Sequence, residues 1–135
     1  MSYISDELRQ LVHNRANGHC EYCHMQARFA VKRHEVDHVR AEKHGGKSIE
    51  ANMCLSCFEC NRHKGSDLTS IDTLTGEITP LFNPRQDNWD DHFRLNGALI
   101  EPLTAVGRAT VFLLQMNNED VVDDRQTLIR SGRYP

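Results

Sequence analysis

Two pairs of cysteines have the spacing of a closed metal site. Cys20 and Cys23 form one CxxC pair, and Cys57 and Cys60 form a second pair further along the chain. Zinc binds four soft ligands in a tetrahedron, and each CxxC turn supplies two thiolates to one side of it. Two such turns fill all four positions, so none is left for a substrate water. The pattern therefore predicts a structural Zn²⁺ site.

A fifth cysteine leaves an alternative ligand set open. Cys54 also makes a CxxC spacing with Cys57. We assign Cys54 to the apolar interior, because a cysteine without a partner is often a small buried residue. A reactive dithiol is the other general interpretation of a CxxC pair, and the presence of two pairs favours zinc over it.

A second set of polar residues lies between and just after the cysteine pairs. In chain order its members are Asp37-His38, Gly45-Gly46, Asn52 and Asn61. Each motif is weak alone, but together with the cysteines they follow a characteristic order. This order resembles the zinc-containing, four-cysteine branch of the HNH endonuclease family, over residues from about 15 to 67.

The resemblance implies a fold, a reaction and a set of residue roles. The fold is a small zinc-stabilised ββα-metal module of treble-clef type, in which two strands and a helix hold a divalent ion. Asp37 and Asn61 correspond to the protein ligands of that catalytic ion, Mg²⁺ or Mn²⁺. His38 corresponds to the general base, and Asn52 braces the loop so that His38 points correctly. The implied reaction is hydrolysis of phosphodiester bonds.

These residue types suit that chemistry. A histidine with an ordinary pKa of about 6.5 is largely neutral at physiological pH and can accept a proton from water. A hard cation prefers oxygen ligands and keeps several waters, so one carboxylate and one amide suffice to hold it. Adjacent residues on a strand point to opposite faces. Asp37 and His38 must therefore lie where the strand is irregular, or the metal must lie at its edge.

Four further residues near these motifs are polar or charged. Asn61 stands in place of the family's last histidine and still offers an oxygen ligand. We expect His34 and His63 to have surface roles, with His34 at a phosphate or in solvent. Lys64 either contacts phosphate or is an exposed lysine at a helix end.

Periodicity and turn residues predict an α+β fold for the whole chain. We expect a single domain over 1–135, with the zinc module at about 15–67 and an extension at about 68–135 packed on it, because a module of ~65 residues barely builds a core alone. The predicted elements are a helix capped by Ser5, extended structure over 29–41, a short helix before Gly65, a hairpin around Thr75-Gly76, one short strand within 92–101, a helix capped by Thr104 and a last helix at about 119–131.

Charge is distributed unevenly along the chain. Residues 1–67 carry 10 Lys and Arg against 9 acids, and residues 68–135 carry 6 against 10, which gives the net charge of −3. Residues 28–47 carry six Lys and Arg against three acids. This segment predicts a locally basic surface, so a nucleic-acid partner, above all double-stranded DNA, is expected from the motifs more than from overall charge.

The sequence contains neither a secretion signal nor a membrane-spanning segment that we can identify. The N-terminal residues lack the basic and apolar regions of a signal, so we expect a cytoplasmic protein. No apolar run reaches the ~20 residues that span a bilayer. The pattern does not indicate an oligomeric state.

The favoured function is a metal-dependent endonuclease acting on DNA. The alternative is a non-catalytic zinc module that binds nucleic acid or protein on an HNH scaffold. A third interpretation, an effector nuclease delivered to another cell, finds no support at the N-terminus. The enzyme is favoured because Asp37, His38, Asn52 and Asn61 are all present.

Overall fold

The computed structural model describes residues 3–135, and its secondary structure mixes helices and short strands. The α-helices are α1 (Asp6–Arg15), α2 (Phe58–Lys64), α3 (Trp89–His92), α4 (Ala105–Leu114) and α5 (Glu119–Arg130). The strands are β1 (Glu35–His38), β2 (Met53–Ser56), β3 (Thr69–Ile71), β4 (Ile78–Pro80), β5 (Phe93–Asn96) and β6 (Leu99–Pro102). The predicted mixture of α and β structure is confirmed. In the described part of the chain, each helix is too short or too polar to cross a bilayer.

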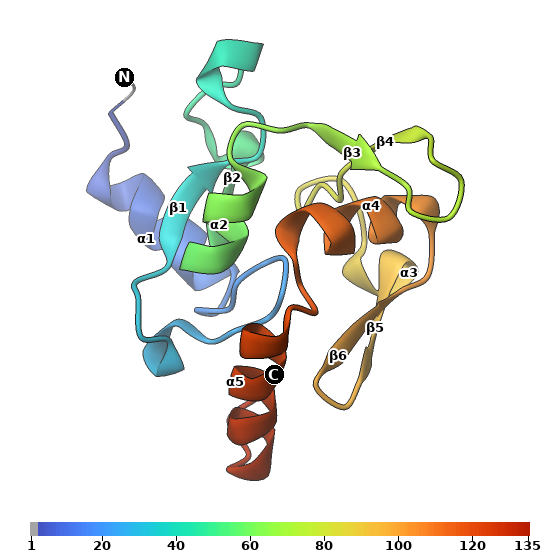
Figure 1. Ribbon diagram of the computed structural model, residues 1–135. Coiled ribbons are helices and arrows are strands. Elements are labelled where there is room, and N and C mark those ends of the chain that lie inside the picture. The colour runs from blue at the N-terminus through green and yellow to red at the C-terminus, as the bar shows by residue number, and fades with distance from the viewer. Residues whose placement is uncertain (1–2) are drawn as a thin grey trace.

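The first half of the chain builds a ββα unit. β1 pairs with β2 in antiparallel register, and α2 follows β2 directly and contacts β1 (Figure 1). α1 begins where the Ser5 hydroxyl accepts a hydrogen bond from the Leu8 N–H, which satisfies a free helix donor. Its buried Val12 packs with Val36 and Leu55 of the two strands. This apolar layer fixes one face of the β1–β2 pair and leaves the other face toward α2.

The second half of the chain contains two further antiparallel strand pairs. β3 and β4 pair across the turn at Thr75-Gly76, in the region where a hairpin is expected. The prediction of one short strand within 92–101 was wrong, because this segment forms two strands, β5 and β6. The chain reverses at Gly97, whose φ of 59° lies in the left-handed region that glycine adopts without strain.

The main core joins residues from both halves of the chain. α4 lies against α2 (Figure 1), and apolar side chains from the second half surround the cysteine pairs. The buried members of this cluster are Cys20, Tyr22, Cys23, Val39, Cys54, Cys57, Cys60, Phe82, Phe93, Ile100, Leu114 and Met116. Directional bonds reinforce the contact, since the Trp89 indole N–H donates to the Tyr22 carbonyl over 2.8 Å.

A buried arginine anchors α5 to the rest of the second half. The Arg125 guanidinium is 1% exposed and donates to the carbonyls of Ala98 (2.7 Å) and Met116 (2.6 Å). A buried charge of this kind is stable only when its donors are satisfied. α5 therefore has a fixed attachment although it projects from the body of the molecule (Figure 1).

Candidate metal centre and nuclease site

Four buried cysteines converge as the two CxxC pairs predict. The Sγ atoms of Cys20, Cys23, Cys57 and Cys60 all lie within 4.8 Å of one another, and those of Cys23 and Cys57 are 3.6 Å apart. A tetrahedral zinc with bonds of about 2.3 Å places its sulfur ligands about 3.8 Å apart. The cluster therefore fits one tetrahedral ion, and its donor set of four thiolates suggests structural zinc.

Each cysteine pair is held in a turn that presents its sulfurs. The Cys23 N–H points at the Cys20 sulfur over 3.5 Å, and the Cys60 N–H points at the Cys57 sulfur over 3.4 Å. Cys57 is also the N-cap of α2, so the second turn and the start of the helix are one structure. Metal binding and the placement of α2 are therefore coupled.

Cys54 is separate from this cluster. Its sulfur lies 3.8 Å from the Tyr22 hydroxyl, inside the core. Burial, with a contribution from nearby Asp37, raises the pKa of Cys54 to about 12, so it remains a thiol at neutral pH. The assignment of Cys54 to the interior is confirmed, and Cys60 takes the fourth position of the metal-binding group.

Asp37 and His38 are the last two residues of β1. Asp37 lies opposite Cys54 and His38 lies opposite Met53, in a regular register. The two side chains therefore leave opposite faces of the strand pair. Because the register is regular up to the last residue of β1, a shared site of Asp37 and His38 would have to lie at the end of the strand. Both are half-buried. Burial raises the pKa of Asp37, and the positive charge of Lys64 acts against that rise.

Lys64 and His34 occupy interior positions, so the expectations for both were wrong. The Lys64 ammonium is buried and donates to the Val39 carbonyl over 3.0 Å, because the end of α2 packs beneath the chain that leaves β1. His34 is 2% exposed, and its Nε2 lies 2.8 Å from the Met25 carbonyl. His63 is partly exposed. Asn61 is partly exposed and one turn before Lys64, so these two side chains share a side of α2.

Asn52 ties together the two ends of the loop between β1 and β2. Its Oδ1 accepts from the Arg40 N–H (2.9 Å), and its Nδ2 donates to the carbonyls of Arg40 (3.0 Å) and Lys47 (2.9 Å). The second glycine of the Gly45-Gly46 pair is required by the same packing. A Cβ on Gly46 would lie 1.7 Å from the Arg40 carbonyl oxygen, so only glycine fits there.

Ser48 contacts the candidate base and was missed by the sequence reasoning. The His38 Nε2 lies 2.8 Å from the Ser48 Oγ. A serine in a polar loop, ten residues from the histidine, carries no local signal of this contact. Only the folding of the loop back toward the end of β1 reveals it.

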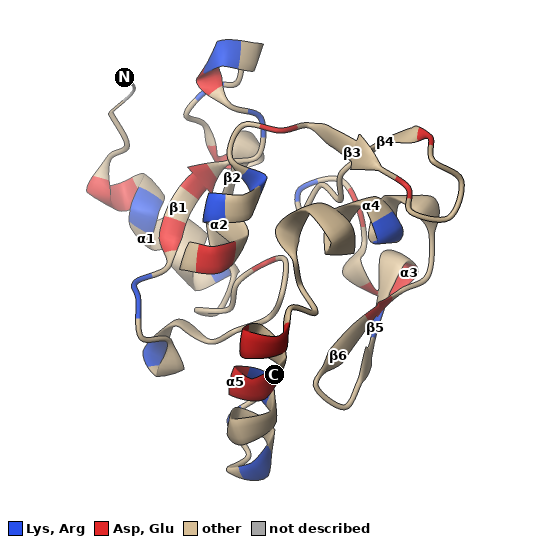
Figure 2. Cartoon of the chain, in the orientation of Figure 1, with Lys and Arg blue, Asp and Glu red and all other residues tan. Residues whose placement is uncertain are grey.

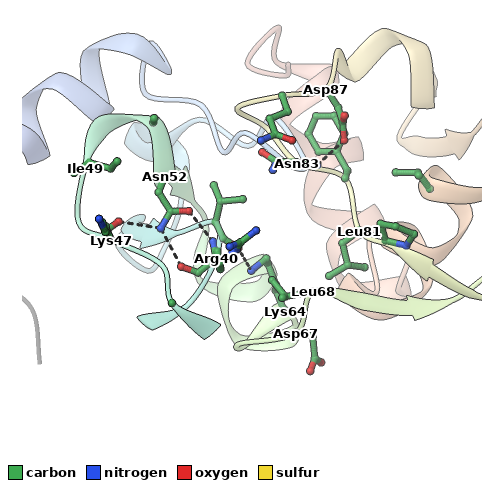
Figure 3. A pocket seen from close by; sticks show the side chains of 17 residues that line it. Arg40, Lys47, Ile49, Asn52, Lys64, Asp67, Leu68, Leu81, Asn83 and Asp87 are labelled. Carbon is green, nitrogen blue, oxygen red and sulfur yellow. Dashed lines mark hydrogen bonds between the residues drawn. The ribbon is translucent and has the colours of Figure 1, made fainter. Parts of the chain in front are cut away.

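A cleft of about 650 Å³ opens beside the Asn52 loop. Figure 3 shows Asn52, Arg40, Lys47 and Lys64 on one side and Asn83 with Asp87 on the other. The two sides come from different halves of the chain. The cleft therefore places polar groups of the second half close to the loop that follows β1.

The first half of the chain combines a ββα unit with four cysteines positioned to bind a metal ion, and this part was compared with known proteins. Residues 20–67 match the family model described as HNH endonuclease, which confirms the resemblance recognised from the motifs. The matched segment contains both cysteine pairs, Asp37, His38, Asn52 and Asn61. Neither the curated proteins nor the solved structures gave a match.

Proposed function

We propose that this protein is a metal-dependent endonuclease that hydrolyses phosphodiester bonds of double-stranded DNA. In this proposal Asp37 and Asn61 hold one divalent ion, Mg²⁺ or Mn²⁺, and His38 is the general base. The observation that carries the proposal is the family match over residues 20–67, a segment that combines these residues with a ββα unit and a loop braced by Asn52. The cysteine group then has a structural role, with zinc as its ion.

Each residue has a task that its environment supports. The carboxylate of Asp37 and the amide oxygen of Asn61 are hard ligands of the kind that Mg²⁺ prefers. When bound, the cation supplies positive charge against the charge that develops on the phosphate. His38 takes the proton of the attacking water. Half-burial of Asp37 makes its negative charge costly in the absence of a cation, as expected of a ligand site.

Positive charges beside the Phe58 ring of α2 suit a partner that carries phosphates. The Lys32 ammonium lies 4.0 Å from the centroid of the Phe58 ring, and the Arg62 guanidinium lies 5.8 Å from the same centroid. Within residues 3–135 neither cation forms an ion pair with a carboxylate. Figure 2 shows basic residues on α2 and the loops around β1, whereas acidic residues gather at the start of α5. Two unneutralised cations at Phe58 suit a phosphate backbone; Arg62 is on the helix that carries Asn61, and Lys32 is in the loop before β1.

A non-catalytic zinc module on the same scaffold is the alternative. Such a module needs the cysteine group and its binding surface but has no use for a general base. The two functions differ in what His38 does, so substitution of that residue separates them. Cytoplasmic location remains a prediction of the sequence.

Plasmid cleavage tests the proposal. Purified wild type is incubated with supercoiled plasmid in Mg²⁺, Mn²⁺ or EDTA, beside His38→Ala prepared identically. We expect nicking that needs the metal and that falls by roughly 10²–10⁴-fold in His38→Ala, the usual contribution of a general base. Equal cleavage by the two proteins indicates a contaminating nuclease and contradicts the proposed mechanism.

A further inference from the structure

We infer that Ser48 is a positioning residue for His38. Its hydroxyl holds Nε2 of the imidazole, so that Nδ1 is the nitrogen that takes the proton of the attacking water. This inference rests on the proposed function, because it assigns the nitrogen through which His38 acts. It also explains how a brace at Asn52 reaches a histidine that Asn52 does not contact.

The two nitrogens of His38 have different surroundings. Nε2 lies 2.8 Å from the Ser48 Oγ. Nδ1 has no hydrogen-bond partner in the part of the chain that the structure describes. The buried polar side-chain atoms without a partner in that part are His34 Nδ1 and Arg85 Nε, so Nδ1 of His38 is not a buried atom. Nδ1 is therefore open to solvent. A neutral imidazole carries one N–H, so donation from Nε2 to Ser48 leaves the lone pair on Nδ1.

Ser48 is held in place from the neighbouring peptide. The Asn52 Nδ2 donates to the Lys47 carbonyl, which belongs to the peptide bond that joins Lys47 to Ser48. The same side chain bonds both the N–H and the carbonyl of Arg40, two residues after His38. One amide thus fixes the chain beside the histidine and the chain beside the serine. The Ser48 hydroxyl completes the connection at the ring itself.

A fixed ring matters because a general base acts only from the correct geometry. Without a partner on Nε2, the imidazole can change tautomer and rotate about its terminal torsion angle. A displacement of about 1 Å at a reacting group can lower a rate by 10²-fold. Removal of a partner that orients a metal-bound histidine typically lowers metal affinity or activity by about 10–100-fold, and we expect a loss of the same order for a histidine that must be oriented as a base.

Kinetics on Ser48→Ala and Ser48→Thr test this role. We expect kcat to fall by about 10–100-fold in Ser48→Ala, with KM for plasmid and zinc content unchanged, and to recover substantially in Ser48→Thr, which keeps a hydroxyl. Ser70→Ala is the matched control, since Ser70 is also partly buried and its hydroxyl has no hydrogen bond within residues 3–135. In a His38→Ala background, Ser48→Ala should cause no further loss. If Ser48→Ala lowers kcat in the His38→Ala background by the same factor as in the wild type, the inference is overturned.

Nitrogen-15 NMR of the histidines tests the contact without cleavage. In its neutral form, the His38 ring of the wild type should show the Nε2–H tautomer, and the His38 ring of Ser48→Ala should shift toward a mixture of the two tautomers. An Nδ1–H tautomer in the wild type overturns the inference. The experiments distinguish failure of the proposed endonuclease function from failure of the Ser48–His38 contact. A protein that never cleaves DNA but shows the Nε2–H tautomer shifted by Ser48→Ala loses the proposed function and keeps the contact.

Discussion

The Tyr134 hydroxyl donates a 2.6 Å hydrogen bond to the Cys23 carbonyl, which joins the first cysteine pair to a residue 111 positions away. Both groups are buried, so Tyr134→Phe leaves a carbonyl without its partner. We expect the free energy of unfolding to fall by about 1–3 kcal/mol. Urea denaturation of the zinc-saturated protein measures this change. Tyr3→Phe is the control, because Tyr3 is 82% exposed, and an equal effect of both variants contradicts the prediction.

The cysteine group predicts which substitutions remove the metal. Elemental analysis should give about one zinc per chain, and serine at Cys20, Cys23, Cys57 or Cys60 should remove zinc and unfold the protein, since metal binding of about 10–16 kcal/mol is coupled to folding. Cys54→Ser should keep its zinc, because its sulfur lies outside the group. Loss of zinc from Cys54→Ser with retention in Cys60→Ser contradicts the assignment.

Substitution of Asp37 should differ from substitution of His38. Asp37→Asn keeps an oxygen but loses the charge, so we expect weaker Mg²⁺ binding and cleavage that recovers partly at high Mg²⁺. His38→Ala should not recover, because it lacks the base. Cleavage rates titrated against Mg²⁺ concentration distinguish the two. Identical metal dependence of both variants is inconsistent with the separate roles proposed here.

The cations beside Phe58 predict a salt-dependent interaction with DNA. Lys32→Gln and Arg62→Gln should each lower the slope of log affinity against log salt concentration by about 0.9, one phosphate contact each. Fluorescence anisotropy with labelled duplex in EDTA measures binding without cleavage. Arg130→Gln, on the exposed end of α5, is the control. An unchanged slope in both test variants removes this surface from the interface.

The ion pair between Asp72 and Arg108 predicts a pH dependence of stability. Hydrogen bonds of 2.7 and 3.0 Å from Arg108 hold the pKa of Asp72 well below its usual range. A lowered pKa stabilises the fold above the unfolded value of about 3.9, and the contribution is lost as pH falls below it. Wild type should therefore be more stable than Asp72→Asn at pH 5–7, with the difference shrinking below about pH 4. Urea midpoints across this range test the prediction, and a constant difference contradicts it.

Local patterns in the sequence determined the parts of this protein that depend on neighbouring residues. The cysteine spacing indicated the metal-binding group, because each CxxC turn is closed by its own backbone N–H groups. Ser5 and Thr104 indicated two helix starts, since each hydroxyl caps an N–H three residues later. The order of the motifs indicated a resemblance to the HNH family over residues from about 15 to 67, and the family model matches residues 20–67.

The tertiary structure decided what depends on contacts between distant segments. Lys64 and His34 are residue types usually found at the surface, but both are buried here. The chain that leaves β1 covers Lys64, whose ammonium donates to the Val39 carbonyl, and the His34 ring lies against the Met25 carbonyl. Ser48 gained its place beside His38 because Asn52 closes the loop between them. The burial and partners of a side chain depend on segments far away in the sequence, and the residue pattern within one helix or strand gives no information about those segments. For this reason the sequence indicated the chemistry of the site, and only the fold decided how its residues are held.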